Sequence, residues 1–96
     1  MSTNPTPFQL AVEETLRDLR PGEVVSYGFV AEQAGYPGRA RGVGAYLASS
    51  PDAPNWWRVV AATGQLRAPR PDRQAELLAA EGVDVVDDRV RLRSSH

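Results

Sequence analysis

The chain has 96 residues, of which 42% are hydrophobic and 24% are charged, and its formal net charge is −1, so we expect residues 1–96 to form a single globular domain. The sequence holds no cysteine, which excludes disulfides, thiolate metal sites and a cysteine nucleophile. It contains neither an apolar run of membrane-spanning length nor the pattern of a signal peptide, so we expect a cytoplasmic protein without membrane contact.

The N-terminal part of the chain predicts a helix followed by a short extended segment. Thr6 is a suitable N-cap residue, and apolar side chains recur at helical spacing over residues 7–19. Pro21-Gly22 then marks a turn. The pair Val24-Val25 favours an extended conformation after that turn.

Two short helices separated by a tight turn are predicted next. Ser26 is a suitable N-cap for a helix over residues 27–34, which Gly35 ends. Pro37-Gly38 marks the turn, and the following helix is predicted over residues 39–48. Two helices joined by a short turn that contains Gly and Pro are typical of a helix-turn-helix.

The segment after these helices predicts a strand and a fourth helix. A loop with two prolines precedes residues 57–62, whose β-branched and aromatic side chains favour a strand. A helix is predicted over residues 72–81, with Asp72 as its N-cap and with Leu77 and Leu78 on its buried side.

The C-terminal residues predict a hairpin. Residues 83–86 and 89–92 alternate apolar and polar side chains on either side of Asp87-Asp88. Helices and small strands arranged around a helix-turn-helix predict an α+β, winged-helix-like domain.

The charges are distributed unevenly along the chain. Residues 37–71 contain five arginines and one aspartate, a local balance of +4, whereas residues 1–36 (two arginines, five acids) balance to −3 and residues 72–96 (four arginines, six acids) to −2. All of the basic side chains are arginines, whose planar fork suits phosphates and base edges. The pattern is compatible with an ordinary solvated surface or with a DNA-binding segment, in which case the acidic flanks should face away from DNA.

The sequence shows no catalytic or metal-binding constellation. The single histidine is His96, the serines have no partner base, and no Gly-rich phosphate loop is present. We therefore expect no catalytic residues, no metal and no cofactor.

Three segments resemble the motifs of the O6-alkylguanine-DNA alkyltransferases, and the resemblance is strongest over residues 24–82. They are Val25-Ser26-Tyr27-Gly28, which resembles Val-Ser/Thr-Tyr-Gly; Ala40-Arg41-Gly42-Val43-Gly44-Ala45, which resembles Ala-Arg-Ala-Val-Gly; and Asn55-Trp56-Trp57-Arg58-Val59, which resembles Pro-Cys-His-Arg-Val. Trp56 stands at the position of the alkyl-accepting cysteine. The chain is therefore most similar to the alkyltransferase-like proteins, and its fold is expected to resemble the DNA-binding C-terminal domain of the alkyltransferases.

The resemblance implies how this chain would hold DNA. Tyr27 would press on the phosphate of the target nucleotide and help to rotate the nucleotide out of the stack. Arg41 would enter the stack and occupy the place of the flipped nucleotide. The helix that carries Arg41 would enter the minor groove. The implied DNA-binding set is Tyr27, Arg39, Arg41, Gly42, Gly44 and Ala45. Judged from the residues alone, the tyrosine could instead be a simple helix-start residue, and the glycines could serve helix packing.

The resemblance also implies a lesion pocket. Trp56 would form its wall and could stack on the flipped base. Tyr27 would line it, and either Arg67 or Arg70 would touch the guanine. Trp57 stands at the position of the histidine that relays a proton in the transferases, and for this residue we favour core packing. Glu81 matches the glutamate partner of that histidine.

The function implied is non-enzymatic binding of O6-alkylguanine in double-stranded DNA by nucleotide flipping. The protein, expected as a monomer, would mark the lesion for nucleotide excision repair proteins. Two alternatives remain: a winged-helix transcriptional regulator that binds undamaged DNA, and a protein-interaction module that uses the acidic flanks. Titration with matched lesion and plain duplexes separates the three.

Overall fold

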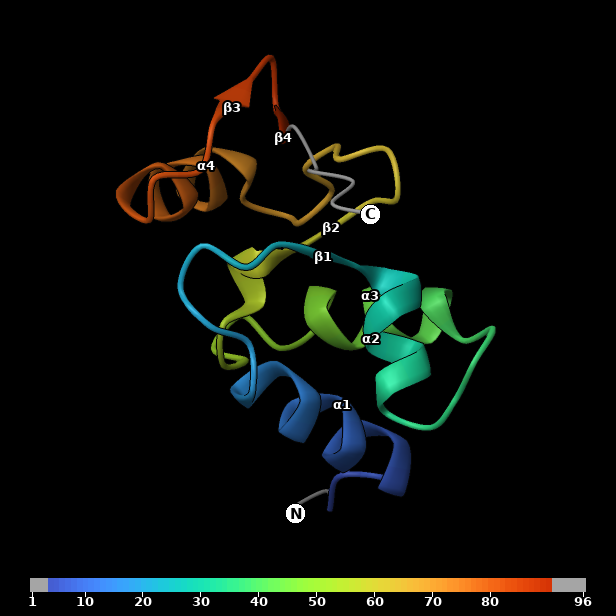
Figure 1. The fold of residues 1–96 in the computed structure, drawn as a ribbon. Helices are drawn as coiled ribbons and strands as arrows, with labels where there is room; N and C mark the ends of the chain where they lie inside the picture. The colour runs from blue at the N-terminus through green and yellow to red at the C-terminus, as the bar shows by residue number, and fades with distance from the viewer. Residues whose placement is uncertain (1–3, 91–96) are drawn as a thin grey trace.

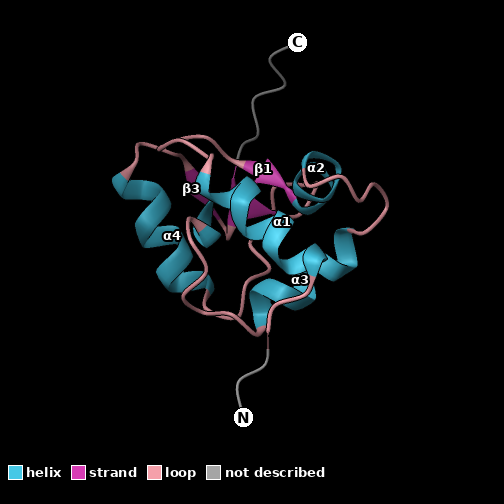
Figure 2. Ribbon diagram, turned by 90° about the horizontal axis from the view of Figure 1, so that it is seen from below, coloured by secondary structure: helices cyan, strands magenta, loops and turns pink. Residues whose placement is uncertain are grey.

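Two small lobes meet at a two-stranded parallel sheet in the computed structural model, which describes residues 4–90 (Figures 1 and 2). The sheet pairs β1, Val25–Ser26, with β2, Val59–Val60. The N-terminal lobe contains the helices α1 Pro7–Arg17, α2 Tyr27–Gln33 and α3 Ala40–Ala48. The C-terminal lobe contains α4, Pro71–Ala80, and a hairpin of β3, Val85–Val86, with β4, Arg89–Val90. The 3-10 helix η1, Trp56–Arg58, lies between the lobes and leads into β2.

The predicted first helix is confirmed, with a slightly earlier end. Thr6 Oγ1 accepts a hydrogen bond from the Gln9 N–H (3.1 Å), and Gln9 Oε1 accepts one from the Thr6 N–H (3.0 Å). This reciprocal capping box fixes the start of α1, as the cap residue predicts. The helix ends at Arg17, and Leu19 lies just beyond it, buried in the core.

The predicted helix-turn-helix is also confirmed. Ser26 caps α2 by accepting a hydrogen bond from the Phe29 N–H at 3.0 Å. The turn between α2 and α3 contains Gly35 and Gly38, whose φ angles of 90° and 85° lie in the region that glycine tolerates best. The two helices pack against each other in the N-terminal lobe, where Val30 and Val43 are fully buried (Figure 1).

The strand predicted over residues 57–62 is mostly wrong. The chain forms a turn at Trp56–Arg58, closed by a hydrogen bond from the Arg58 N–H to the Asn55 carbonyl (3.0 Å), and only Val59–Val60 is a strand. Asn55 enters this turn with a left-handed φ of 54°. Strand propensity reports how well a side chain fits a pleated surface, so it did not reveal this change in backbone direction.

The fourth helix starts differently from its prediction. It begins at Pro71 with Arg70 as its N-cap, and no side chain caps it, so Asp72 lies in its first turn instead. Leu78 is fully buried as predicted, but Leu77 is only partly buried, and Gln74 takes the other buried position. Asp87 and Asp88 have positive φ angles of 52° and 58°, which suit the predicted hairpin turn. The predicted strand residues 91–92 lie outside the described residues.

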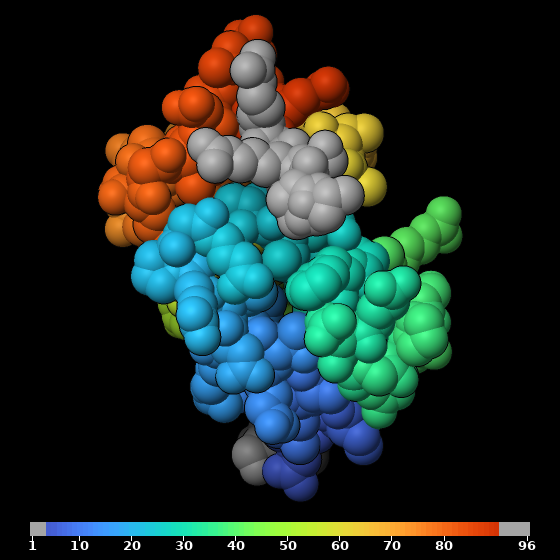
Figure 3. Space-filling model, viewed as in Figure 1, coloured from blue at the N-terminus to red at the C-terminus, as the bar shows by residue number. Residues whose placement is uncertain are grey.

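Two separate hydrophobic cores fill the lobes, and the small sheet divides them. The space-filling view shows the lobes from outside, with the C-terminal segments above the N-terminal helices (Figure 3). Val25 and Val59, which pair in the sheet, belong to the core of the N-terminal lobe. Val24 and Val60 pack in the core of the C-terminal lobe. Adjacent residues of an extended segment point to opposite faces, so each extended segment contributes to both cores.

Over residues 4–90 no helix is long and apolar enough to cross a bilayer.

Candidate nucleic-acid interface

One face of α3 is open to solvent. Arg41 and Ala45 are exposed, whereas Val43 and Leu47 point into the core. Gly44 lies beside this exposed face, and a Cβ atom added there would meet nothing within 4 Å. The spacing of Arg41 and Ala45 places them one turn apart on the same side of the helix. This face can therefore approach another surface closely, and the exposed Arg41 side chain would contact that surface.

Gly42 does not share that environment. A Cβ atom at Gly42 would lie 3.0 Å from the Phe8 ring of α1, which is closer than ordinary van der Waals contact. The glycine thus lets α3 pack on α1, and this corrects the expectation that Gly42 serves close approach to a groove. Arg39 precedes the helix, and its guanidinium lies over the same Phe8 ring, 5.5 Å from the ring centre. Arg39 is exposed, so it remains a candidate for phosphate contact.

Tyr27 is the first residue of α2 and stands between α3 and the loop that precedes α4. Its side chain is partly buried against the N-terminal core. Burial raises the pKa of the Tyr27 phenol, and the positive charge of Arg67 opposes this effect. The phenol is therefore neutral at physiological pH, which allows it to donate a hydrogen bond to a phosphate oxygen without charge repulsion.

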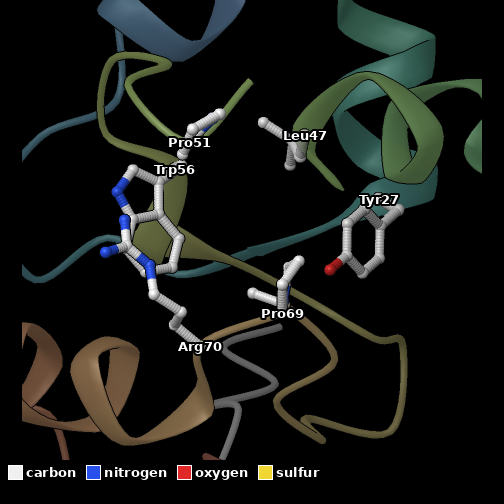
Figure 4. Close-up of a pocket in the computed structure, with 7 residues that line it drawn as sticks. Tyr27, Leu47, Pro51, Trp56, Pro69 and Arg70 are labelled. Carbon is white, nitrogen blue, oxygen red and sulfur yellow. The ribbon is translucent and has the colours of Figure 1, made fainter. Parts of the chain in front are cut away.

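An open pocket lies between the helix-turn-helix and the loop that leads to α4. Its walls come from three parts of the chain. The residues that line it are Tyr27, Leu47, Pro51, Trp56, Ala68, Pro69 and Arg70. Figure 4 shows the Tyr27 and Trp56 rings on opposite sides, with Leu47 and Pro69 between them. The lining is mostly apolar and aromatic, so it suits a flat ring with an apolar substituent.

The pocket distinguishes the two arginine candidates. The Arg70 guanidinium lies over the Trp56 ring, 6.0 Å from the ring centre, and lines the pocket. Figure 4 shows this stacking at the side of the pocket opposite Tyr27. Arg67 does not line the pocket; its guanidinium donates to Gln65 Oε1 at 3.4 Å on the exposed surface. Arg70 is therefore the stronger candidate for contact with a base in the pocket.

Trp57 packs away from the pocket, into the C-terminal core. Its indole N–H donates to Glu81 Oε2 at 2.9 Å, and its ring meets the Trp56 ring edge-on, with 6.1 Å between the ring centres. The interpretation of Trp57 as a packing residue agrees with this position. The residue also retains a partner at Glu81, which a packing role alone does not require.

Glu81 is the centre of a polar cluster that links η1, α4 and the turn after α1. Its carboxylate accepts hydrogen bonds from Arg58 Nη2 (2.6 Å), the Gly22 N–H (2.7 Å) and Trp57. The hydrogen bond from Arg58 is the main reason that the pKa of Glu81 falls from its ordinary 4.5 to about 2, and Gly22 and Trp57 lower it further. The carboxylate stays ionised and acts as a clamp between η1, α4 and the turn after α1.

Arg58 therefore does not belong to the free positive charge of the central segment. Its side chain is buried, and the guanidinium also donates to the Leu19 carbonyl at 2.9 Å. Of the five arginines over residues 37–71, four remain exposed: Arg39, Arg41, Arg67 and Arg70.

We expected the acidic flanks to face away from DNA. One acidic residue of the N-terminal flank nevertheless lies beside the helix-turn-helix. Glu13 of α1 accepts a weak hydrogen bond from the Tyr46 hydroxyl of α3 at 3.4 Å. Glu13 also pairs with Arg17 at 2.9 Å, which reduces its net field. Tyr46 lies on the side of α3 that faces α1, so this carboxylate is beside the helix but away from Arg41.

The sequence comparisons place the chain in a known family. The family described as "6-O-methylguanine DNA methyltransferase, DNA binding domain" matches residues 7–83. The chain belongs to this family. The match covers the N-terminal core, the helix-turn-helix and the pocket, together with most of the C-terminal core, and the α+β fold expected from the resemblance is confirmed.

Individual relatives are of two kinds. A "DNA base-flipping protein" of Vibrio parahaemolyticus is 37% identical over 82 residues, which cover 81% of this chain and 82% of the relative. A "Methylated-DNA--protein-cysteine methyltransferase" of Shigella flexneri is 52% identical, but only over 52% of this chain and 29% of the relative. The chain therefore matches the base-flipping protein over nearly its whole length and the transferase over one segment.

Solved structures show the same division. S. pombe Atl1, in complex with damaged DNA containing O6-carboxymethylguanine, has a TM-score of 0.81 at 25% identity and covers 95% of this chain and 93% of that one. The Mycobacterium tuberculosis O6-methylguanine methyltransferase has a TM-score of 0.72 at 36% identity, over 83% of this chain and 51% of that one. Because this family member has no cysteine, it cannot accept an alkyl group as the transferases do, and it is not an enzyme of that kind.

Proposed function

We propose that this protein binds O6-alkylguanine in double-stranded DNA by flipping the damaged nucleotide into the pocket between Tyr27 and Trp56. The observation that carries the proposal is the pocket itself. Leu47 of α3 and Tyr27 of α2 line it, and a tryptophan stands where the transferases have their acceptor cysteine.

The geometry supports distinct roles for the residues around the pocket. Arg41 projects from α3 and can fill the gap that a flipped nucleotide leaves in the stack. Tyr27, as a neutral phenol, can contact the phosphate. Trp56 offers a ring for stacking, worth about 1–3 kcal/mol per base. Arg70, already over the Trp56 ring, can reach the edge of the base or its substituent.

Events after binding are a further part of the proposal. A protein that holds a lesion without repairing it is useful only when another activity removes the damage. We therefore propose that the bound monomer marks the site for nucleotide excision repair proteins, and that it does so in the cytoplasm. The similarity to base-flipping proteins supports the binding and flipping of the damaged nucleotide. The recruitment of repair proteins is an extension of that proposal.

The decisive experiment is a titration with two duplexes that differ only in O6-methylguanine against guanine. We expect tighter binding of the lesion duplex. Arg41→Ala should lower lesion affinity by about 1–3 kcal/mol while the fold is retained, since the side chain is exposed. Arg20→Ala removes the same charge from the acidic N-terminal flank and is the matched control. Equal affinities for both duplexes would instead favour a regulator of undamaged DNA, and no DNA binding would favour an interaction module.

A further inference from the structure

Asn55, immediately before the pocket tryptophan, has a backbone conformation that the family motif does not permit. Its φ and ψ are 54° and 26°, in the left-handed region, which asparagine tolerates better than most residues. The transferase motif has proline at this position, and proline is restricted to a φ of about −65°. The turn that carries Trp56 is therefore entered differently in this chain.

The side chain of Asn55 reaches the end of α1. Its Nδ2 group donates hydrogen bonds to the carbonyls of Leu16 (2.8 Å) and Leu19 (3.3 Å). The Leu19 carbonyl also accepts from Arg58 Nη1 at 2.9 Å. Leu16 belongs to the last turn of α1, and Leu19 lies two residues beyond the end of the helix. Two side chains of the turn therefore hold the C-terminal end of α1 and the residues just after it from a distant part of the sequence.

The opposite side of the turn is held by α4. The buried Gln74 side chain donates from Nε2 to the carbonyls of Trp57 (3.1 Å) and Val59 (2.9 Å). The backbone of η1 is thus fixed between two helices, one in each lobe. Trp56, by contrast, makes no side-chain hydrogen bond within residues 4–90, so the orientation of its ring depends on the backbone beneath it and on packing.

We propose that Asn55 is a positioning residue for lesion recognition. By fastening η1 to the end of α1, it holds the Trp56 ring in the pocket wall before DNA arrives. This inference rests on the proposed function, because it assigns a consequence for lesion preference. A ring that is already ordered loses less freedom on binding, so the lesion complex is favoured over plain DNA, which does not use the pocket.

The test compares Asn55→Gly with Asn4→Gly, the same substitution at the other asparagine of the chain, which is exposed. Glycine keeps the left-handed backbone and removes only the two side-chain hydrogen bonds. We expect Asn55→Gly to reduce the preference for an O6-methylguanine duplex over the matched guanine duplex about threefold to tenfold, the range of one or two ordinary hydrogen bonds. Affinity for the guanine duplex should stay unchanged, and Asn4→Gly should match wild type in both.

A second measurement without DNA separates this inference from the proposed function. ¹⁵N-labelled protein should give one indole N–H signal for each of its two tryptophans, and Trp57→Phe identifies the signal of Trp57. Asn55→Gly should increase the fast motion of the Trp56 indole, seen as a lower heteronuclear Overhauser effect. An unchanged Trp56 signal, or an unchanged lesion preference beside a lowered melting temperature, would overturn the positioning role and leave Asn55 as a helix cap. If wild type shows no lesion preference, the proposed function fails and the DNA-free measurement alone decides the role of Asn55.

Discussion

Gly42 and Gly44 are separated by one residue of α3 but serve different purposes. Gly42 faces the Phe8 ring, which is itself held edge-on by Tyr36 with 5.1 Å between ring centres. Gly44 faces open space. Glycine within a helix lowers the stability by about 0.5–1 kcal/mol relative to alanine, so each glycine should have a reason in its surroundings. For Gly42 that reason is helix packing, and for Gly44 we propose that it is close approach to DNA.

Alanine at the two positions should therefore separate stability from binding. Gly44→Ala should raise the free energy of unfolding by about 0.5–1 kcal/mol through helix propensity and weaken binding of both duplexes through its added methyl group. Gly42→Ala should gain little or no stability, because the methyl group meets Phe8. Urea unfolding and duplex titration of both variants provide the measurement. Equal stabilisation by the two substitutions would contradict the packing role of Gly42.

Trp57 determines what a restored cysteine could do. Its ring occupies the histidine position and directs its N–H toward Glu81, so no imidazole stands there to take a proton from a thiol. We expect that Trp56→Cys alone produces no alkyl transfer. Incubation with DNA carrying a radiolabelled O6-methyl group measures this directly, with a family transferase as positive control. Stoichiometric label on the variant would show that the histidine position is dispensable here.

At the scale of whole elements, the Glu81 cluster ties η1 and α4 to the turn after α1 and should make stability depend on pH. The pKa of Glu81 is about 2 in the folded chain and 4.5 ordinarily, so the unfolded chain binds the proton first as the pH falls. The stabilisation is present above pH 4.5 and is lost between 4.5 and about 2. Glu81→Gln should melt well below wild type at pH 7, and the gap should narrow toward pH 3. A gap that is constant with pH would argue against an ionised clamp.

Elements defined by local signals could be predicted from the sequence, whereas those defined by distant contacts could not. Thr6 and Ser26 cap their helices through hydrogen bonds that span three residues, so the cap residues predicted both helix starts. The η1 turn depends on Asn55 reaching α1 across 36 to 39 residues and on Gln74 reaching back from α4. No local pattern signals such contacts. The same limit applied to the pocket. The sequence did not indicate whether Arg67 or Arg70 lines it, because the contact of Arg70 with Trp56 joins distant residues.

For the whole molecule, the distribution of charge predicts how binding responds to salt. Burial of Arg58 leaves Arg39, Arg41, Arg67 and Arg70 available for phosphates in the central segment. If three or four of them displace counterions, log K should fall against log salt with a slope of about −3 to −4. Fluorescence titrations of both duplexes at several salt concentrations measure this slope. Lesion preference should persist as salt rises, since stacking is screened less than phosphate contact; convergence of the two affinities would mean that the pocket contributes little.

The division of side chains between two cores has a consequence for how the molecule opens. Trp56 and Val59 pack with the N-terminal core, whereas Trp57 and Val60 pack with the C-terminal core. If either lobe unfolds, the segment of residues 56–60 beside the pocket loses its packing contacts with one of the two cores. We therefore expect hydrogen exchange to reveal one cooperative unit in which the slowest amides of α3 and α4 share a single opening free energy. A bound lesion should slow exchange equally at both ends of the molecule, far beyond the residues that touch DNA.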